Sequence, residues 1–339
     1  MKHILNSRPT FPTIPALPFT RWRGRWRLRD RLIRAVLSFG VLGCIVANPQ
    51  ASAQEARSEP LLVTAEGIVS AYGAPSSFSE ARFTPNVTAY VLPPWTFAFN
   101  TIYEGDIFDN SPPDHLFTQE MEMGLPHRFG IATEGKFERF DGDGGPSTIS
   151  VEMRYAFADW GKIPLNPTIF GEYKFGVGNI RHEEGPPPPP GEEEEESGPP
   201  KVPNAYEFRL LLADEFFKRV EWAANFFFEM EPTGDRGREW GVAQSIVTPV
   251  LLPHEQLKVG VEMEYKNFTV KDTRGDAENI FVIGPTVSLR TSKSTHFDVS
   301  ALAGCTDESP DLKVFAVFSW LLGPGGAEQG EAPVSTRNR

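Results

Sequence analysis

The sequence has no uninterrupted apolar run of the roughly 18 residues that a membrane-spanning helix requires. This absence excludes a helical membrane protein. It does not exclude a transmembrane barrel, because barrel strands are short and polar on one face. Cysteine is almost missing as well. Cys44 lies in the predicted leader and Cys305 stands alone, so the mature chain forms no internal disulfide. No consecutive Arg-Arg pair is present, which argues against twin-arginine export.

Residue types that carry catalysis or bind metals are scattered. Four histidines are expected in loops or turns, namely His115, His127, His182 and His254. Only His296 is expected on a polar strand face. No histidine is expected on an apolar face, where a barrel phospholipase would need one beside a nucleophilic serine. The stretch 141–145 has calcium-friendly oxygens but lacks the rest of a binding loop, so it predicts a tight turn. The sequence thus predicts no enzyme, no cofactor and no metal.

The first 53 residues have the order of a secretory signal peptide. The basic stretch 21–34 precedes the apolar stretch 35–47, which is too short to span a membrane as a helix. An A-x-A site at 51–53 then favours cleavage before Gln54. We therefore expect an exported protein. One alternative stays open, because residues 41–44 resemble a bacterial lipobox, in which case Cys44 would carry lipid.

The balance of charge is acidic. The full chain has a net charge of −12. Cleavage after residue 53 removes nine basic residues and one acidic residue, which leaves 24 basic against 44 acidic residues and a net charge of −20. This balance disfavours nucleic acid and anionic lipid head groups as partners. The basic N-terminus would be a nucleic-acid-binding arm only if the mature protein retained it.

Alternation with a period of two is what the sequence has in abundance. In the stretch 147–161, Val151 and Met153 share one face while Glu152 and Arg154 share the other, as on a strand with one apolar and one charged face. Twelve such segments follow one another, each ended by Gly, Pro, Asp or Asn. They span approximately 95–104, 115–125, 129–140, 147–158, 166–177, 205–215, 219–230, 238–248, 257–270, 279–291, 295–304 and 312–322.

The charged face of these segments is expected to face the inside of a barrel. Connections after even-numbered segments are mostly short, and those after odd-numbered segments are longer or more polar, as in a closed meander with one periplasmic and one external rim. A soluble sandwich gives no reason for this sorting. A basic side chain facing lipid at the membrane midplane costs about 2–4 kcal/mol, so the apolar face is expected to contact lipid.

The predicted lumen-lining residues are interleaved with the small side chains that a crowded barrel interior requires. They are Glu120, Glu122, Glu134, Lys136, Glu152, Arg154, Glu172, Lys174, Glu207, Arg209, Glu221, Lys258, Glu262, Glu264, Lys266 and Arg290. Acids outnumber bases on the polar faces, which predicts a modest preference for cations. Arg139 and Gln244 fall on the apolar face. Arg139 lies near a strand end, where the cost is small, whereas the sequence offers no account of Gln244.

Three further segments lack the alternation. Residues 181–200 combine a polyproline run with five consecutive glutamates, which predicts a disordered or extended external loop. This loop is expected to be a solvated shield, with capture of cations or of a basic partner as the alternative. Residues 54–94 are expected to form a periplasmic extension, with a piece tucked into the lumen as the alternative. Residues 323–339 predict a flexible periplasmic tail.

Three stretches carry a family resemblance: "GLPHRFGIATEGKF", "EMRYAFADWGKIPLNPTIFGEYKFG" and "TDESPDLKVFAVFSWLL". They resemble bacterial outer-membrane barrels described as porin-like or as transporters of aromatic-degradation pathways. The resemblance covers roughly residues 93–322 and lies in pattern and spacing. It implies a gram-negative outer-membrane location and passage of small molecules. Such barrels commonly end on an aromatic residue, whereas here Trp320 is followed by a further segment.

The sequence therefore predicts one all-β domain, an antiparallel up-and-down barrel of about twelve strands over residues 95–322, with both termini periplasmic. The expected function is a passive channel or porin-like transporter. Its expected partners are outer-membrane lipid and small solutes or ions, with no nucleic acid. A non-conducting structural or surface-binding outer-membrane protein is the alternative. A soluble periplasmic β protein is a third possibility.

Overall fold

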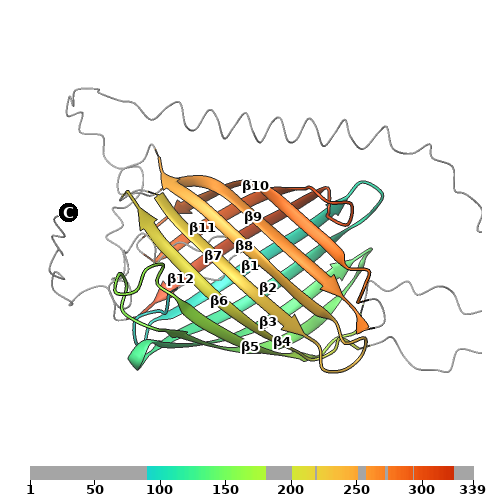
Figure 1. Ribbon diagram of the computed structural model, residues 1–339, viewed down its shortest axis with the longest axis horizontal. Coiled ribbons are helices and arrows are strands. Elements are labelled where there is room, and N and C mark those ends of the chain that lie inside the picture. The colour runs from blue at the N-terminus through green and yellow to red at the C-terminus, as the bar shows by residue number, and fades with distance from the viewer. Residues whose placement is uncertain are drawn as a thin grey trace, which may run out of the picture.

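The computed structural model describes residues 90–180, 201–217, 220–250, 257–271, 274–292 and 294–323. Within them, twelve strands close into a barrel in which chain neighbours pair antiparallel and β12 pairs with β1 (Figure 1). The strands are β1 Phe97–Phe108, β2 Ser111–Leu125, β3 Phe129–Phe140, β4 Asp143–Ala156, β5 Thr168–Gly176, β6 Ala205–Phe216, β7 Val220–Met230, β8 Arg238–Pro249, β9 Leu257–Thr269, β10 Glu278–Arg290, β11 Thr295–Gly304 and β12 Leu312–Leu322.

Several predicted segments lie outside the described residues. They are the leader 1–53 with Cys44, most of the segment 54–94, the loop 181–200 and nearly all of the tail 323–339. Among the described residues, no helix is long and apolar enough to cross a membrane.

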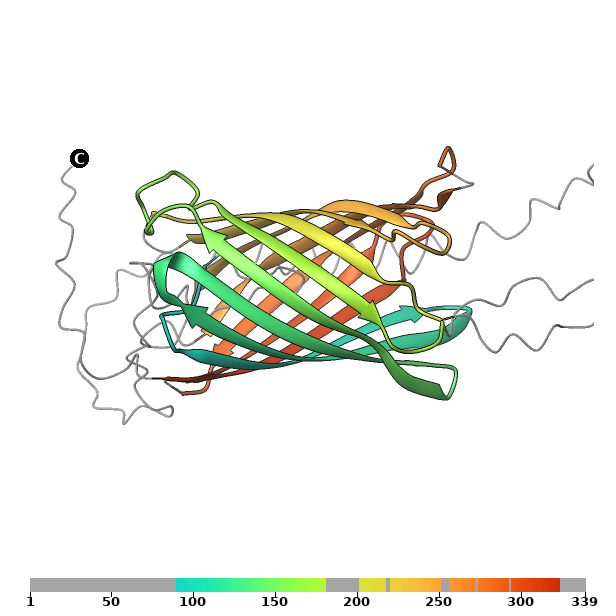
Figure 2. The ribbon, with the colours of Figure 1, turned by 90° about the horizontal axis from the view of Figure 1, so that it is seen from below.

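The twelve-stranded antiparallel barrel confirms the predicted fold class. The two rims are defined by the chain ends. Phe97 at the start of β1 pairs with Leu322 at the end of β12, and we call this end of the barrel the terminal rim. The opposite end, where β1 leads into β2, is called the loop rim. The strands run at a slant between the two rims, as both views show (Figure 2).

Two connections that the sequence predicts to be longer, polar loops are tight hairpins. Only Asp109 and Asn110 join β1 to β2, and only Asp141 and Gly142 join β3 to β4. Asp141 and Gly142 have φ angles of 42° and 86°, the left-handed values that a two-residue hairpin turn requires. The tight turn expected in this stretch is thereby confirmed. The four strands that flank these hairpins have 12 to 15 residues, more than a membrane crossing requires, and their polar ends resemble loops in composition.

The predicted sorting of connection lengths between the rims therefore holds only in part: four of the six loop-rim connections, among them 231–237 and 305–311, are longer than the three-residue connections 126–128 and 217–219 at the terminal rim. Both two-residue hairpins lie at the loop rim, and the 157–167 connection lies at the terminal rim. The 157–167 connection is ordered by its own contacts. Asn166 Nδ2 donates to the carbonyl oxygen of Ala213 at 2.9 Å, and the Arg128 guanidinium lies 3.3 Å from the Asp159 carboxylate.

The outer face of the barrel carries large exposed hydrophobic side chains. On β4, Val151 and Met153 expose 56% and 58% of their surface, whereas Glu152 and Arg154 between and beside them expose 2% and 4%. Successive residues on a strand point to opposite faces, so the apolar row faces outward and the ionic row inward. A soluble monomer rarely exposes so large an apolar area. A closed barrel with an apolar outside has the surface of a membrane-spanning protein.

Aromatic side chains mark both ends of the apolar band. Trp95 and Trp320 are exposed near the terminal rim, and Trp240 is exposed near the loop rim. Phe99 packs beside Trp320 with ring centroids 6.5 Å apart. Aromatic rings of this kind favour the boundary between lipid and water, because one edge is apolar while the other reaches polar groups.

Two polar side chains on the outer face, Gln244 and His115, have hydrogen-bond partners. Gln244 accepts a hydrogen bond from Trp222 Nε1 at 3.4 Å, which supplies the account that the sequence lacked. His115 lies within β2 and not in a loop, on the same face as the exposed Phe117. Its Nδ1 is 2.9 Å from the Tyr103 hydroxyl. The prediction that no histidine lies on the apolar face is therefore wrong. Such pairs satisfy polar groups where lipid offers none.

An arginine on the apolar row tests which side faces lipid. Val151→Arg, in the middle of β4, is expected to lower the free energy of unfolding by about 2–4 kcal/mol, because a cation at the midplane loses its hydration. Ile107→Arg, on the same face near the loop rim, is expected to cost about 0–1 kcal/mol. Reversible urea unfolding in phospholipid vesicles measures both. Equal costs for the two variants would contradict the assignment of the outer face.

Candidate functional site: the charged interior

The residues predicted to line the lumen lie on inward-facing positions of the strands. Most of them expose no more than 7% of their surface; these are Glu120, Glu122, Glu152, Arg154, Glu172, Glu207, Glu221, Lys258, Glu262, Glu264 and Arg290. The others are partly exposed; these are Glu134, Lys136, Lys174, Arg209 and Lys266. Buried ions are stable only when they are paired and hydrogen-bonded, so the contacts among these side chains decide what the interior can do.

Arg154 is the centre of the first ion cluster. Its guanidinium donates to carboxylate oxygens of Glu120 at 3.1 Å, Glu122 at 3.1 Å and Glu152 at 2.9 Å. Asn100 Nδ2, on β1, donates to Glu120 at 2.8 Å and to Glu122 at 3.2 Å. The cluster therefore joins β1, β2 and β4. The planar guanidinium fork with several donors suits a site that several carboxylates share.

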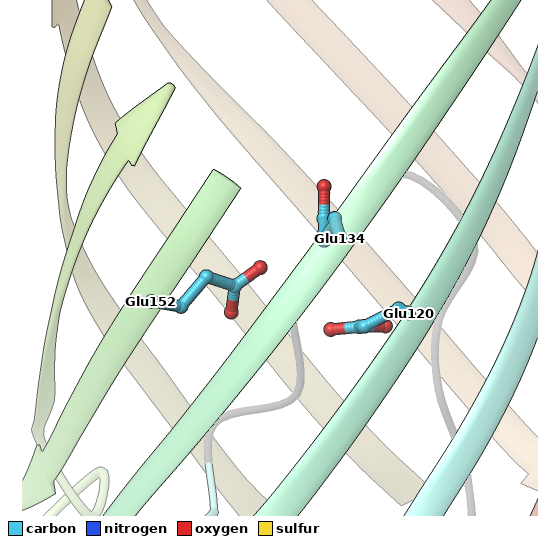
Figure 3. Close-up of side chains that lie close together, drawn as sticks. All are labelled: Glu120, Glu134 and Glu152. Atoms are coloured by element: carbon cyan, nitrogen blue, oxygen red, sulfur yellow. The ribbon is translucent and has the colours of Figure 1, made fainter. Parts of the chain in front are cut away.

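Three carboxylates converge beside this arginine. Glu120, Glu134 and Glu152 come from three adjacent strands, and each offers an oxygen within 4.8 Å of the others (Figure 3). Oxygen atoms at such spacing could surround a hard cation. However, Arg154 already binds Glu120 and Glu152, so ion pairing accounts for the convergence and we assign no metal here. The sequence placed these residues on one face but gave no measure of their proximity.

Lys174 is the centre of the second ion cluster. Its Nζ donates to Glu207 at 2.7 Å and to Glu229 at 2.5 Å, and lies 3.7 Å from Glu172. Arg209 Nε also donates to Glu207. The Arg209 guanidinium lies over the ring of Phe170, 5.5 Å from its centroid, and over the ring of Phe227, at 5.2 Å. Such cation–π contacts add stability to a desolvated cation.

The third ion cluster contains residues that the sequence analysis missed. Lys313 on β12 donates to Glu104 and lies 3.4 Å from Asp106 and 3.8 Å from Glu264. Glu104 was placed at the very end of the first predicted strand, and Asp106 was placed in a loop. Lys313 was missed because the other residues of β12, apart from Ser319, are apolar. The alternation of the first strand continues past Glu104, and following it further would have placed Glu104 and Asp106 on the inward face.

The interior is more exposed toward the loop rim than toward the terminal rim. Near the loop rim, the side chains of Glu229, Glu239 and Lys266 expose 25%, 26% and 24% of their surface. Near the terminal rim, Lys258 and Glu221 are paired at 2.9 Å and expose only 3% each. The charged side chains of the interior are therefore more accessible near the loop rim than near the terminal rim.

Apolar side chains occupy the interior at the terminal rim, a feature that the sequence analysis did not predict. We call this group the floor cluster. It consists of Tyr90, Leu92, Ala98, Phe170, Leu211, Ala213, Ala223, Val247 and Leu321. Trp160, from the 157–167 connection, packs against it. The interior at the terminal rim is therefore apolar along β1, β5, β6, β8 and β12, whereas Glu221, Lys258, Arg290 and His296 make it polar along β7 and β9 to β11.

No family model and no curated protein match the sequence. Among solved structures, an outer membrane channel from Pseudomonas putida F1 is similar over 70% of this chain and 99% of its own, with 7% identity and a TM-score of 0.49. The KdgM porin is similar over 66% of this chain and 98% of its own, with 10% identity and a TM-score of 0.37. At these values the likeness is one of general barrel architecture and assigns no activity to this chain.

The prediction that the chain is not an enzyme is wrong, because an enzyme is not excluded. LpxR from Salmonella typhimurium, a lipid A deacylase, is similar over 66% of this chain and 99% of its own, with 8% identity and a TM-score of 0.35. Barrels of this kind thus include enzymes. The sequence-based argument against an enzyme assumed that no histidine lies on the outer face, whereas His115 lies there. No reaction is assigned to the present chain.

Removing the central cation of the first ion cluster tests how much the interior depends on pairing. Arg154→Gln is expected to lower the free energy of unfolding by about 3–5 kcal/mol, because it leaves three buried carboxylates without their arginine. Arg128→Gln removes an exposed guanidinium that pairs with Asp159 and donates to the carbonyl oxygen of Ala156, and it is expected to cost less than about 1 kcal/mol. Urea unfolding in vesicles compares them. Similar small losses would show that the cluster is not what holds these strands together.

Proposed function

We propose that the chain is a bacterial outer-membrane barrel that passes small solutes or ions through its charged interior. The observation that carries the proposal is the division of the strands into an outward apolar row and an inward ionic row, with the ionic side chains more exposed near the loop rim. Membrane lipid contacts the outside. Solutes contact side chains such as Lys136, Lys266 and Glu239.

The proposal includes an export route and an orientation. Residues 1–53 act as the cleaved leader, and residues 95–322 form the membrane domain. The terminal rim faces the periplasm, because assembly from that side places both chain ends there. The loop rim, with residues 181–200, faces outside. The tail 323–339 is periplasmic.

The charge of the interior favours cations. Each ion cluster contains more carboxylates than bases: Arg154 contacts three glutamates, and Lys313 contacts Glu104, Asp106 and Glu264. A pore lined by excess acidic groups attracts cations and repels anions. The side chains nearest the loop rim have the largest influence, because they are the most accessible to a solute that enters from there.

One observation favours a second candidate function. The floor cluster fills part of the interior at the terminal rim, which fits a non-conducting structural or surface-binding protein whose work is done at the loop rim. In that case the acidic loop 181–200 would bind the partner. Deleting residues 181–200 separates the candidates, because a channel would still conduct, whereas a binding protein would lose its partner.

Single-channel recording in a planar bilayer tests the main proposal. The purified protein is expected to show small, discrete conductance steps with modest cation selectivity. Glu239→Gln removes a partly exposed interior acid, so it is expected to lower the ratio of cation to anion permeability, whereas Lys266→Gln is expected to raise it. Glu308→Gln, on the exposed β11–β12 connection, is the control and should leave the ratio nearly unchanged. Clear anion selectivity, or no conductance, would contradict the channel proposal.

A further inference from the structure

The chain turns back into the barrel immediately before β1. Thr96 N donates to the carbonyl oxygen of Pro93 at 3.0 Å and closes a tight turn in which Trp95 has a φ of 65°. Because the chain reverses there, the residues before the turn enter the interior. Tyr90, Val91 and Leu92 expose only 7%, 3% and 4% of their surface. We call residues 90–93 the strap.

Two glycines of the barrel wall make room for the strap. Gly124 on β2 and Gly130 on β3 are paired directly opposite each other. A Cβ atom on Gly124 would lie 2.2 Å from the carbonyl oxygens of Leu92 and Pro93, a distance at which backbone atoms clash. A Cβ atom on Gly130 would lie 3.2 Å from Val91 Cγ1. A side chain at Gly124 would thus displace the strap from the wall.

The strap completes the apolar floor cluster. Tyr90 and Leu92 belong to the same buried group as Phe170, Leu211 and Val247, which come from three different strands. The strap also borders the first ion cluster, because a small cavity beside it is lined by Glu122 and Arg154. The strap therefore lies beside the first ion cluster at the terminal-rim end of the interior.

We infer that the strap is the gate of the proposed channel. This inference rests on the proposed function. Buried apolar side chains in a pore exclude water and ions, so the path to the terminal rim is narrowed while the strap occupies the floor cluster. The strap lies outside the strand ladder, whereas each barrel strand is hydrogen-bonded to neighbours on both sides. It can therefore leave the wall by local opening, without disrupting the barrel.

A disulfide between strap and wall tests the gate directly. The double variant Val91→Cys with Gly130→Cys, made in a Cys305→Ser background, places two thiols at positions that are already in contact. Oxidation is expected to reduce the open probability in planar-bilayer recordings at least about tenfold, because the strap can no longer leave. Reduction with dithiothreitol is expected to restore it. Each single cysteine variant in the same background serves as the control and should not respond to oxidation.

Weakening the floor cluster tests the same gate in the opposite direction. Leu92→Ser is expected to raise the ratio of open to closed time about tenfold, which corresponds to about 1.4 kcal/mol, with the conductance of the open state unchanged. Leu322→Ser makes the same chemical change at the same rim on the outer face and should leave the ratio unchanged. The slower migration of heated relative to unheated samples on a gel checks that each variant has folded as a barrel.

The outcomes separate the gate from the channel. The gate is overturned, while the channel stands, if the oxidised double variant conducts as well as the reduced one and mass spectrometry verifies the cross-link. If Leu92→Ser leaves the open-to-closed ratio unchanged in a conducting, folded barrel, the gate is likewise overturned. If no variant conducts under any condition, including Leu92→Ser, the channel proposal fails and the gate fails with it.

Discussion

Closure of the sheet between β1 and β12 is the constraint on which the rest of the structure depends. In hydrocarbon, a strand with an unpaired edge would leave amide and carbonyl groups without hydrogen bonds, and each such group costs several kcal/mol. Pairing Phe97–Ile107 with Leu312–Leu322 removes that edge. Once the sheet is closed, alternate side chains have only two environments. The sequence assigns apolar residues to one and ionic residues to the other.

Enclosing the ionic row creates a demand for pairing that the three ion clusters meet. Arg154, Lys174 and Lys313 each contact carboxylates on strands that are not their immediate neighbours. These contacts run along the inner surface of the barrel and join strands that are not paired by backbone hydrogen bonds. A buried ion pair adds little net stability compared with apolar packing, yet breaking one partner of the pair is costly. The ion clusters therefore fix the charged side chains of the interior, while the floor cluster fills part of its terminal-rim end.

Periodicity in the sequence was sufficient to predict the fold, because a half-buried strand must alternate wherever its two faces meet different surroundings. It was weaker where both faces are apolar. Phe170, Leu211 and Val247 point inward, yet their composition resembles that of lipid-facing positions, so the floor cluster was missed. The polar ends of some strands were predicted as loops, so Asp106 was not recognised as a residue of β1. The convergence of charges from several strands depends on register and curvature, and neither can be read from one strand at a time.

The central claim is that lipid contacts the apolar row and that the ionic row is enclosed. Spin labels attached to single cysteines along β4, in a Cys305→Ser background, test it most directly. Labels at Ile149, Val151 and Met153 are expected to be accessible to oxygen, which partitions into lipid. Labels at Ser150 and Ala156 are expected to be protected from it. Accessibility that varies with a period of two in this phase supports the account, whereas the opposite phase, or no alternation, would contradict it.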